Sequence, residues 1–207
     1  MISHRHRCVF VHIPKTGGTS IEDAIWEKPR RTEDLWMGFV SPTHNKYQTG
    51  GLQHLQARHI RTEVGEEIFR SYFKFAIVRN PWDKAVSQWR YLSQRRDLRD
   101  YLGVPADVTL AHYLDTVAVS DHVQVMAQAE FVCDDDGQLM VDMLGRFETL
   151  EADARAIFAR IGLPEAHLPH VTKSERAADY RIYYDAGTRE RVAELYARDI
   201  ELFGYRF

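Results

Sequence analysis

Nine residues near the N-terminus, positions 12–20, read HIPKTGGTS and directly follow the apolar run CVFV. Gly17 and Gly18 let the backbone bend, so that the amides beside them can point at one spot where the dipole of a following helix reinforces them. Lys15 adds a point charge. Hydroxyl donors come from Thr16, Thr19 and Ser20. We therefore expect residues 15–20 to form a cradle for an anion rather than an ordinary glycine turn.

The order of residues in this loop separates it from the phosphate-binding loop of nucleoside triphosphatases. That loop reads G-x-x-x-x-G-K-[ST], with the lysine after the glycines. Here Lys15 precedes both glycines, and no obvious hydrophobic strand ending in a magnesium-binding aspartate follows. The sequence therefore disfavours a metal-dependent triphosphatase.

A second candidate anion site lies in the segment FAIVRNPWDKAVSQW. Arg79 follows a predicted strand, and Ser87 lies two turns into a helix that begins at Asn80 and Pro81, an asparagine cap followed by a proline in the first helical position. A guanidinium leaving a strand end and a hydroxyl on the next helix could close on one phosphate. The alternative is that Arg79 forms a structural salt bridge and Ser87 is a neutral helix position.

The elements that must position these residues alternate along the chain. Hydrophobic runs rich in β-branched and aromatic residues predict strands at 8–13, 72–78 and 140–147. Periodic apolar positions and stop signals predict helices at 20–26, 55–64, 80–99, 109–117, 123–129, 150–161 and 188–203. Residues 29–51 are expected to form a long irregular segment, and Asp134–Gly137 a turn inside a small hairpin.

Alternating strands and helices predict an α/β fold, a parallel sheet flanked by helices, formed by a single domain over residues 1–207. Ligands of such sheets bind beyond the carboxyl ends of the strands. The two strand-to-helix junctions, near Lys15 and near Arg79, are therefore the expected binding region.

Composition narrows the classes of function. The chain has 207 residues, 44% of them hydrophobic, and a formal net charge of -3, which makes nucleic acid a poor expectation. Cys8 and Cys133 lie far apart without a CxxC partner, so we expect two buried thiols rather than a disulfide or zinc site. No apolar run approaches the roughly 20 residues of a membrane span, so the sequence predicts a cytoplasmic protein.

Four segments together resemble the sulfotransferase family, in the branch of the Golgi carbohydrate sulfotransferases and their bacterial relatives. They are HIPKTGGTS, YFKFAIVRNPWDKAVSQW, GRFETLEAD and the tail from LPHVTKSERAADYRIYYD to GYRF. The resemblance implies a P-loop-NTPase-like fold that uses 3'-phosphoadenosine 5'-phosphosulfate (PAPS), releases the bisphosphate PAP and requires no metal.

The resemblance also implies roles for individual residues. The 5'-phosphosulfate would be held by Lys15, Thr16, Gly17, Gly18, Thr19 and Ser20, and the 3'-phosphate by Arg79 and Ser87. Lys15 would meet the leaving oxygen, where negative charge develops during sulfuryl transfer. Family segments near the cofactor are also matched by Arg146, by Phe147 and by the run from Lys173 to Arg176.

A base must accept the proton of the acceptor hydroxyl. The segment GGLQHLQARHIR resembles a family segment in which a histidine, here His54, serves as base in some members. The alternative is that His54 only caps the nearby helix. His44 is the next candidate, while His59 could line the same face and Glu22 is a weaker option. A structural role is expected for His12, and a solvated one for His4 and His6.

Three functions remain open at this point. The first is PAPS-dependent transfer to a hydroxyl of a small-molecule or glycan acceptor, most simply a carbohydrate. The second is a nucleotide or small-molecule kinase with a variant phosphate loop, and the third a binder of phosphorylated nucleotides without catalysis. Tyr180, Tyr183 and Tyr184 are expected to pack rather than stack on a ligand. A basic helix face, solvated or holding an anionic polysaccharide, would comprise Arg90, Arg95, Arg96 and Arg99.

Overall fold

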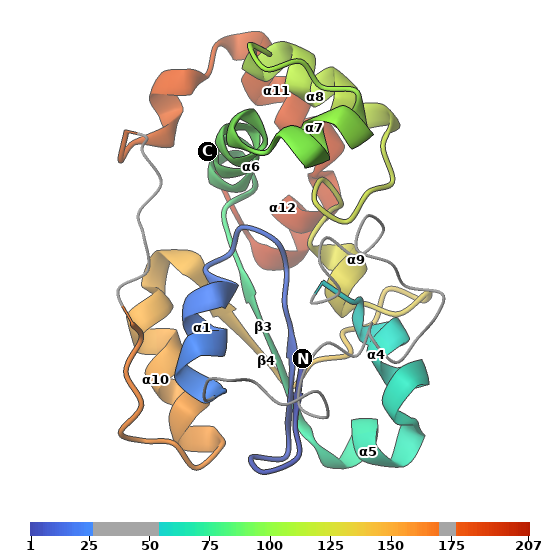
Figure 1. Cartoon of the computed structure of the whole chain (residues 1–207), viewed down its shortest axis with the longest axis vertical. Coiled ribbons are helices and arrows are strands. Elements are labelled where there is room, and N and C mark those ends of the chain that lie inside the picture. The colour runs from blue at the N-terminus through green and yellow to red at the C-terminus, as the bar shows by residue number, and fades with distance from the viewer. Residues whose placement is uncertain (27–53, 170–176) are drawn as a thin grey trace.

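A computed structural model describes residues 1–26, 54–169 and 177–207 (Figure 1). Its sheet has the strand order β1-β2-β3-β4. The strands are β1 (Ile2–Ser3), β2 (Cys8–Val11), β3 (Phe73–Val78) and β4 (Met143–Arg146). β2, β3 and β4 are parallel neighbours, whereas β1 pairs antiparallel with β2 at one edge. The predicted α/β fold with a helix-flanked parallel sheet is confirmed, and β1 is an antiparallel addition that the sequence analysis missed.

Side chains of the central strands alternate between two buried faces. On one face, Phe10 and Phe75 pack in a cluster with α1 (Gly18–Ile25) and α10 (Leu150–Arg160). On the other, Val11 and Val78 pack in a cluster that includes residues of α4 (Ala57–Val64), α5 (Glu66–Ser71) and α9 (Ala129–Val132). Because successive strand residues point to opposite faces, a strand covered on both sides needs an unbroken apolar run. CVFV and FAIV supply such runs.

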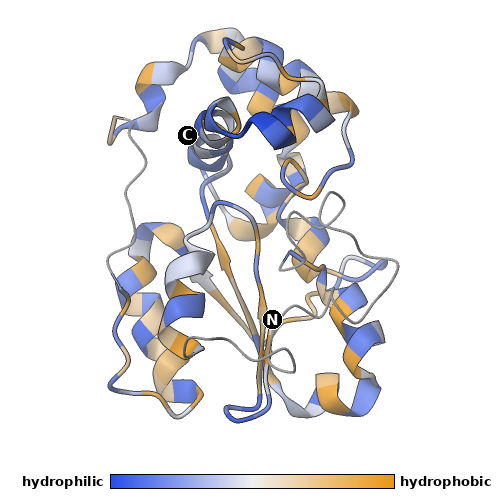
Figure 2. Ribbon diagram, viewed as in Figure 1, coloured by the Kyte–Doolittle hydropathy of each residue, from blue (hydrophilic) through white to orange (hydrophobic). Residues whose placement is uncertain are grey.

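A group of helices lies beyond the carboxyl end of β3 (Figure 1). It contains α6 (Pro81–Gln94), α7 (Arg96–Leu102), α8 (Leu110–Val119), α11 (Ala186–Leu195) and α12 (Ala197–Phe203). Residues of α6, α8 and α11 form a third hydrophobic cluster, with Trp82, Tyr113 and Val192 among its buried members. In Figure 2, β3 and β4 are coloured hydrophobic over much of their length and α7 largely hydrophilic. The helix α6 thus leads from the end of β3 directly into this third cluster.

Two helices expected as continuous are interrupted. The helix predicted at 80–99 divides at Arg95 into α6 and α7, and the one at 188–203 divides at Tyr196 into α11 and α12. At the first break, the Arg99 guanidinium donates to the carbonyl of Ser93. At the second, the Tyr196 hydroxyl donates to the carbonyl of Val125 at 2.8 Å. The first of these contacts is local and the second is tertiary, and a periodic apolar pattern predicts neither.

The prediction of a helix at 123–129 is wrong. Residues 123–128 form turns and irregular backbone, and only Ala129–Val132 is helical. Two backbone amides of this segment donate to side chains, Gln124 to Nδ1 of His122 at 3.2 Å and Gln128 to Asp199 at 2.8 Å. These amides are therefore not available for a helical ladder. The helix α5 was not predicted.

The predicted turn and the two predicted thiols are confirmed. Asp134–Gly137 is a turn, closed by a bond from the Gly137 amide to the Asp134 carbonyl at 3.0 Å, and Cys133 and Leu139 form an antiparallel bridge across it. Cys8 and Cys133 are buried thiols that form no disulfide, as predicted. The irregular segment at 29–51 lies outside the described residues. Within the described ranges, none of the helices has the length and apolar character needed to cross a bilayer. The small η2 (Phe147–Thr149) and η3 (Tyr180–Tyr183) complete the described elements.

Candidate active site

The loop between β2 and α1 has an unusual backbone. Lys15 has a φ of 65° and Gly17 a φ of 85°, so two of its residues lie in the left-handed region. The hydroxyl of Thr16 donates to the carbonyl of Ile13 at 2.9 Å and is fully buried, so it closes the loop from within. Gly17 caps α1, whose first turn contains Thr19 and Ser20. The free amides of a helix start and its dipole make this end of α1 attractive to an anion.

Close packing around the loop explains why positions 17 and 18 are both glycine. A Cβ at Gly17 would lie 2.9 Å from Cδ2 of Leu150 and 3.2 Å from Cδ2 of Phe147. A Cβ at Gly18 would overlap the ring of His12. Gly17 therefore needs both its positive φ and its small size, and Gly18 needs its small size.

The second junction begins where β3 ends. The Asn80 side chain accepts from the amides of Trp82 and Asp83, and Pro81 occupies the first helical turn, so α6 starts with the cap that the sequence predicted. Asp83 then lies one turn from Arg79 and pairs with its guanidinium through Nε at 2.8 Å and Nη2 at 2.7 Å. The carboxylate and the cap thus fix the direction in which Arg79 leaves the strand.

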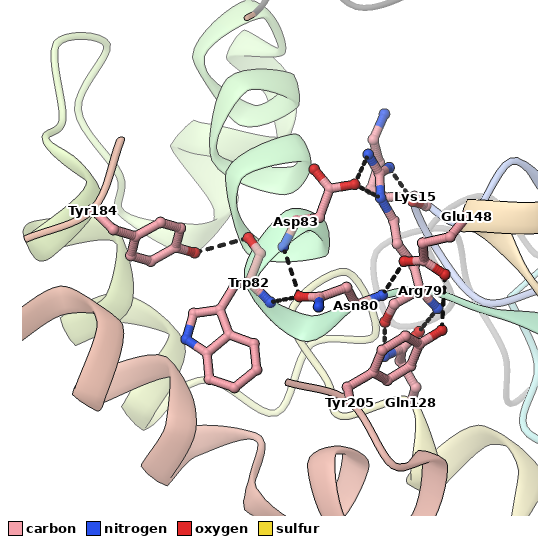
Figure 3. A network of polar contacts seen from close by, with 9 residues as sticks. All are labelled: Lys15, Arg79, Asn80, Trp82, Asp83, Gln128, Glu148, Tyr184 and Tyr205. Atoms are coloured by element: carbon pink, nitrogen blue, oxygen red, sulfur yellow. Dashed lines mark hydrogen bonds and ion pairs between the residues drawn. The ribbon is translucent and has the colours of Figure 1, made fainter. Parts of the chain in front are cut away.

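Arg79 also joins the two junctions. Its Nη1 donates to the carbonyl oxygen of Lys15 at 2.8 Å (Figure 3). The ring of Phe147 lies 3.8 Å from the guanidinium carbon and also borders Gly17. Arg79 itself is only 4% exposed. The loop and the strand end that the sequence analysis selected separately are therefore parts of one site.

One face of α6 runs along this site. Asp83, Ser87 and Tyr91 are spaced four residues apart, which places them on the same side of the helix. Asp83 contacts Arg79, and the Tyr91 ring lies 4.1 Å from Nζ of Lys15. Ser87, which is buried, lies between these two contacts along the helix. The structure thus brings Lys15, Arg79 and Ser87 to the same face of α6.

His54 lies at the start of the described segment before α4 and is buried. Its Nδ1 is 2.8 Å from the carbonyl oxygen of His12. Because a carbonyl can only accept, Nδ1 carries the proton and Nε2 of the neutral ring has a lone pair. Burial, reinforced by the nearby His12 ring, lowers the pKa of His54 well below its usual value. The ring is therefore uncharged at neutral pH.

His12 supports both the loop and His54. Its Nδ1 is paired with Oε1 of Glu22 at 2.6 Å, and both side chains are buried. Its ring meets the His54 ring nearly edge-on, with centroids 4.4 Å apart. The predicted structural role of His12 is confirmed, and Glu22 is the residue that orients it. Sequence periodicity could not connect His12 with His54, because the contact spans 42 residues.

The remaining candidates are placed as follows. Arg146 ends β4 beside Val78, but its guanidinium donates to the carbonyl of Phe203 at 2.6 Å and lies over the Tyr205 ring. His59 lies within α4. His4 is exposed, with Nδ1 2.8 Å from the Tyr72 hydroxyl. His44 and Lys173 lie outside the described residues.

Sequence reasoning missed three residues of the site: Asp83, Tyr91 and Gln128. Asp83 could have been found, because it lies four residues after Arg79 and the two side chains pair across that spacing. Tyr91 continues the same four-residue spacing along α6, whereas Gln128 approaches from a distant segment and leaves no local signal.

The aromatic tail packs as expected. The Tyr184 hydroxyl donates to the Trp82 carbonyl at 2.8 Å, and the rings of Tyr180 and Tyr184 both contact Phe207 edge-on. The predicted basic helix face is divided between α6 and α7, and two of its arginines form exposed ion pairs with acidic neighbours, Arg95 with Asp97 and Arg96 with Asp100.

Sequence comparison finds known proteins that are similar to this chain. The family model described as "Sulfotransferase family" matches residues 1–206. Carbohydrate sulfotransferase 10 of Xenopus laevis is 25% identical over 248 aligned positions, which cover 99% of this chain and 66% of that protein. An uncharacterized protein of Archaeoglobus fulgidus is 30% identical over 106 residues, 51% of this chain and 81% of that protein. No solved structure gives a significant match.

Proposed function

Because the chain belongs to the sulfotransferase family, with its P-loop-like fold, we propose that it transfers a sulfuryl group from PAPS to a hydroxyl of a carbohydrate acceptor. The similarity to a carbohydrate sulfotransferase of Xenopus laevis supports a carbohydrate as the acceptor. One observation carries the proposal most directly. The bond from Arg79 to the Lys15 carbonyl joins two cationic residues and a helix start in a single site, which suits a nucleotide with anionic groups at both ends.

The anionic groups of PAPS would be divided between the two junctions. Lys15 and the backbone and hydroxyl groups of residues 16–20 would bind the 5'-phosphosulfate. Arg79 and Ser87 would bind the 3'-phosphate, and Arg146 and Lys173 belong to the same proposed set. The existing partners of Arg79 support this assignment, because a guanidinium already oriented by Asp83 loses less entropy when it binds an anion.

PAPS would supply a sulfuryl group already attached to a good leaving phosphate. Lys15 stabilises the negative charge on the bridging oxygen as the sulfur–oxygen bond breaks and its electron pair stays with the phosphate. The loop amides share that charge. Since these donors are fixed before substrate binds, they favour the transition state over the ground state.

His54 takes the acceptor proton. As the acceptor oxygen forms its new bond to sulfur, its proton passes to Nε2 of His54, the nitrogen that the bond to His12 leaves unprotonated. The base is neutral at physiological pH because burial lowers its pKa. Glu22, by holding His12, keeps the backbone carbonyl that orients the base in place.

Calorimetric titration with PAP and separately with ATP and magnesium tests the cofactor. We expect PAP to bind and ATP with magnesium to bind more weakly. The opposite preference would favour a kinase and overturn the proposal. Transfer of sulfur-35 from labelled PAPS to a panel of glycans tests the acceptor, and PAP binding without any transfer would instead indicate a nucleotide-binding protein that is not an enzyme.

A further inference from the structure

The side chain of Gln128 pairs with the backbone of Arg79 at both of its polar groups. Oε1 of Gln128 accepts from the Arg79 amide at 2.8 Å, and Nε2 donates to the Arg79 carbonyl at 2.8 Å. Arg79 follows the last residue of β3, so its peptide groups lie past the end of that strand. The carboxamide therefore pairs with Arg79 in the way that a neighbouring strand would (Figure 3).

Asp199 of α12 holds Gln128 in this orientation. Its Oδ2 accepts from the Gln128 amide at 2.8 Å and from Nε2 at 3.2 Å, while its Oδ1 accepts from the Ala129 amide at 2.8 Å. A backbone N–H can only donate, so the oxygen of the Gln128 carboxamide must face the Arg79 amide and its NH₂ group must face Asp199. This fixes the amide without ambiguity and directs Oε1 toward the Arg79 amide.

Burial raises the free-energy cost of losing any of these bonds. Gln128 and Asp199 are both 0% exposed. A buried polar group that loses its partner keeps the full cost of desolvation, because water does not replace the bond. Burial raises the pKa of Asp199, and the N–H groups bonded to it and the nearby Lys84 charge oppose that shift. The pair is thus a fully partnered polar connection between the C-terminal helix and the end of β3.

We infer that Gln128, oriented by Asp199, is a positioning residue for the anion site at Arg79. Gln128 fixes the backbone from which the guanidinium leaves, whereas Asp83 and Phe147 fix the guanidinium itself. The affinity for the 3'-phosphate then depends on α12, although no residue of that helix is assigned to the ligand. This inference rests on the proposed function.

The test compares Gln128→Met with a matched control, Gln124→Met. Methionine keeps length and apolar burial but makes neither bond to Arg79. Gln124 lies in the same segment and is also buried, but its carboxamide accepts from Gln88 at 3.1 Å. We expect Gln128→Met to raise the Kd for PAP and the KM for PAPS by about tenfold, with the acceptor KM unchanged. The control should change the Kd by less than about threefold.

A readout without ligand separates this inference from the proposed function. Hydrogen exchange at the Arg79 amide, measured by NMR, should accelerate about tenfold in Gln128→Met but not in the control. Failure of the wild-type protein to bind PAP would overturn the proposed function, while exchange would still report on the backbone contact. Faster exchange with unchanged PAP affinity, in a protein that binds PAP, would overturn the positioning role.

A second variant covers the case in which Gln128→Met does not fold. Asp199→Asn keeps the volume of the side chain but replaces one acceptor oxygen with a donor, so it no longer suits all three facing N–H groups. We expect a Kd for PAP raised about threefold, with the same order of effect on exchange at Arg79. An Asp199→Asn protein that is folded and indistinguishable from wild type in both measurements would contradict the inference.

Discussion

Nη1 of Arg79 donates to the backbone carbonyl of Lys15 at 2.8 Å, across 64 positions of sequence. The contact uses the main chain of Lys15 and leaves its side chain directed along α6, where Nζ lies over the Tyr91 ring at 4.1 Å. Removing either side chain should therefore affect a different part of the site.

Lys15→Ala should lower turnover far more than affinity for PAP. The variant keeps the carbonyl that Arg79 needs, so the 3'-phosphate site stays intact while the charge at the leaving oxygen is lost. We expect kcat to fall about 100-fold and the Kd for PAP to rise by less than about fivefold. Single-turnover sulfur-35 transfer and calorimetry check this. A loss confined to PAP binding would show that the role of Lys15 is misassigned.

Arg79→Ala should instead lower the affinity for PAP. Charge-assisted hydrogen bonds contribute roughly 1.5–3 kcal/mol, so we expect the Kd to rise by about 10- to 100-fold. Arg79→Lys serves as the matched variant, because it keeps the charge but cannot contact Asp83 and Lys15 together, and it should recover only part of the affinity. Calorimetric affinity equal to that of wild type in Arg79→Ala would exclude Arg79 from the binding site.

His54→Ala should abolish transfer and leave PAP affinity nearly unchanged, with a loss in kcat of about 10²- to 10⁴-fold. Because burial lowers the pKa of His54, its imidazole keeps the base form as the pH falls through 6.5. The acid limb of the kcat profile should accordingly lie below pH 6.5. An acid limb above that value would assign the base to another group.

Gly18→Ala should destabilise the fold through its overlap with His12. Overpacking of this kind costs about 1–3 kcal/mol, or roughly 2–12 °C in Tm for a chain of this size. The control is Gly187→Ala, where the nearest atom to a new Cβ is 3.6 Å away. Combining Gly18→Ala with His12→Ala should cost less than the sum of the two single changes, as measured by thermal unfolding. Strict additivity would mean that the two residues do not compete for space.

Because of Lys84, the free energy of unfolding should change with pH in the alkaline range. Burial lowers its pKa from 10.5 to about 8, against the favourable charge of Asp199. Between about pH 8 and pH 10.5 the unfolded chain binds more protons at this site than the native chain, so this contribution to the free energy of unfolding rises with pH. Its full range is about 3 kcal/mol. Urea unfolding of wild type and Lys84→Met should diverge over this interval, and parallel curves would contradict the assignment.

The sequence predicted the parts of this protein whose signal is local. Unbroken apolar runs identified β2 and β3, and the asparagine cap with its proline identified the start of α6. The glycine loop was found because its residue types serve one chemistry. The sequence did not reveal Gln128 because it bonds to Arg79 and Asp199, which are 49 and 71 positions away. The same bonds take the place of the helical hydrogen bonds that the segment was expected to form.

The left-handed backbone at Lys15 has an evolutionary consequence. At a φ of 65° an ordinary L-residue carries a penalty of roughly 1–2 kcal/mol that glycine avoids. A variant with glycine at position 15 would relax the turn yet remove the ammonium group. If selection acted on folding alone, this position would drift toward glycine, so a lysine here marks a site where demand for positive charge outweighs conformational ease.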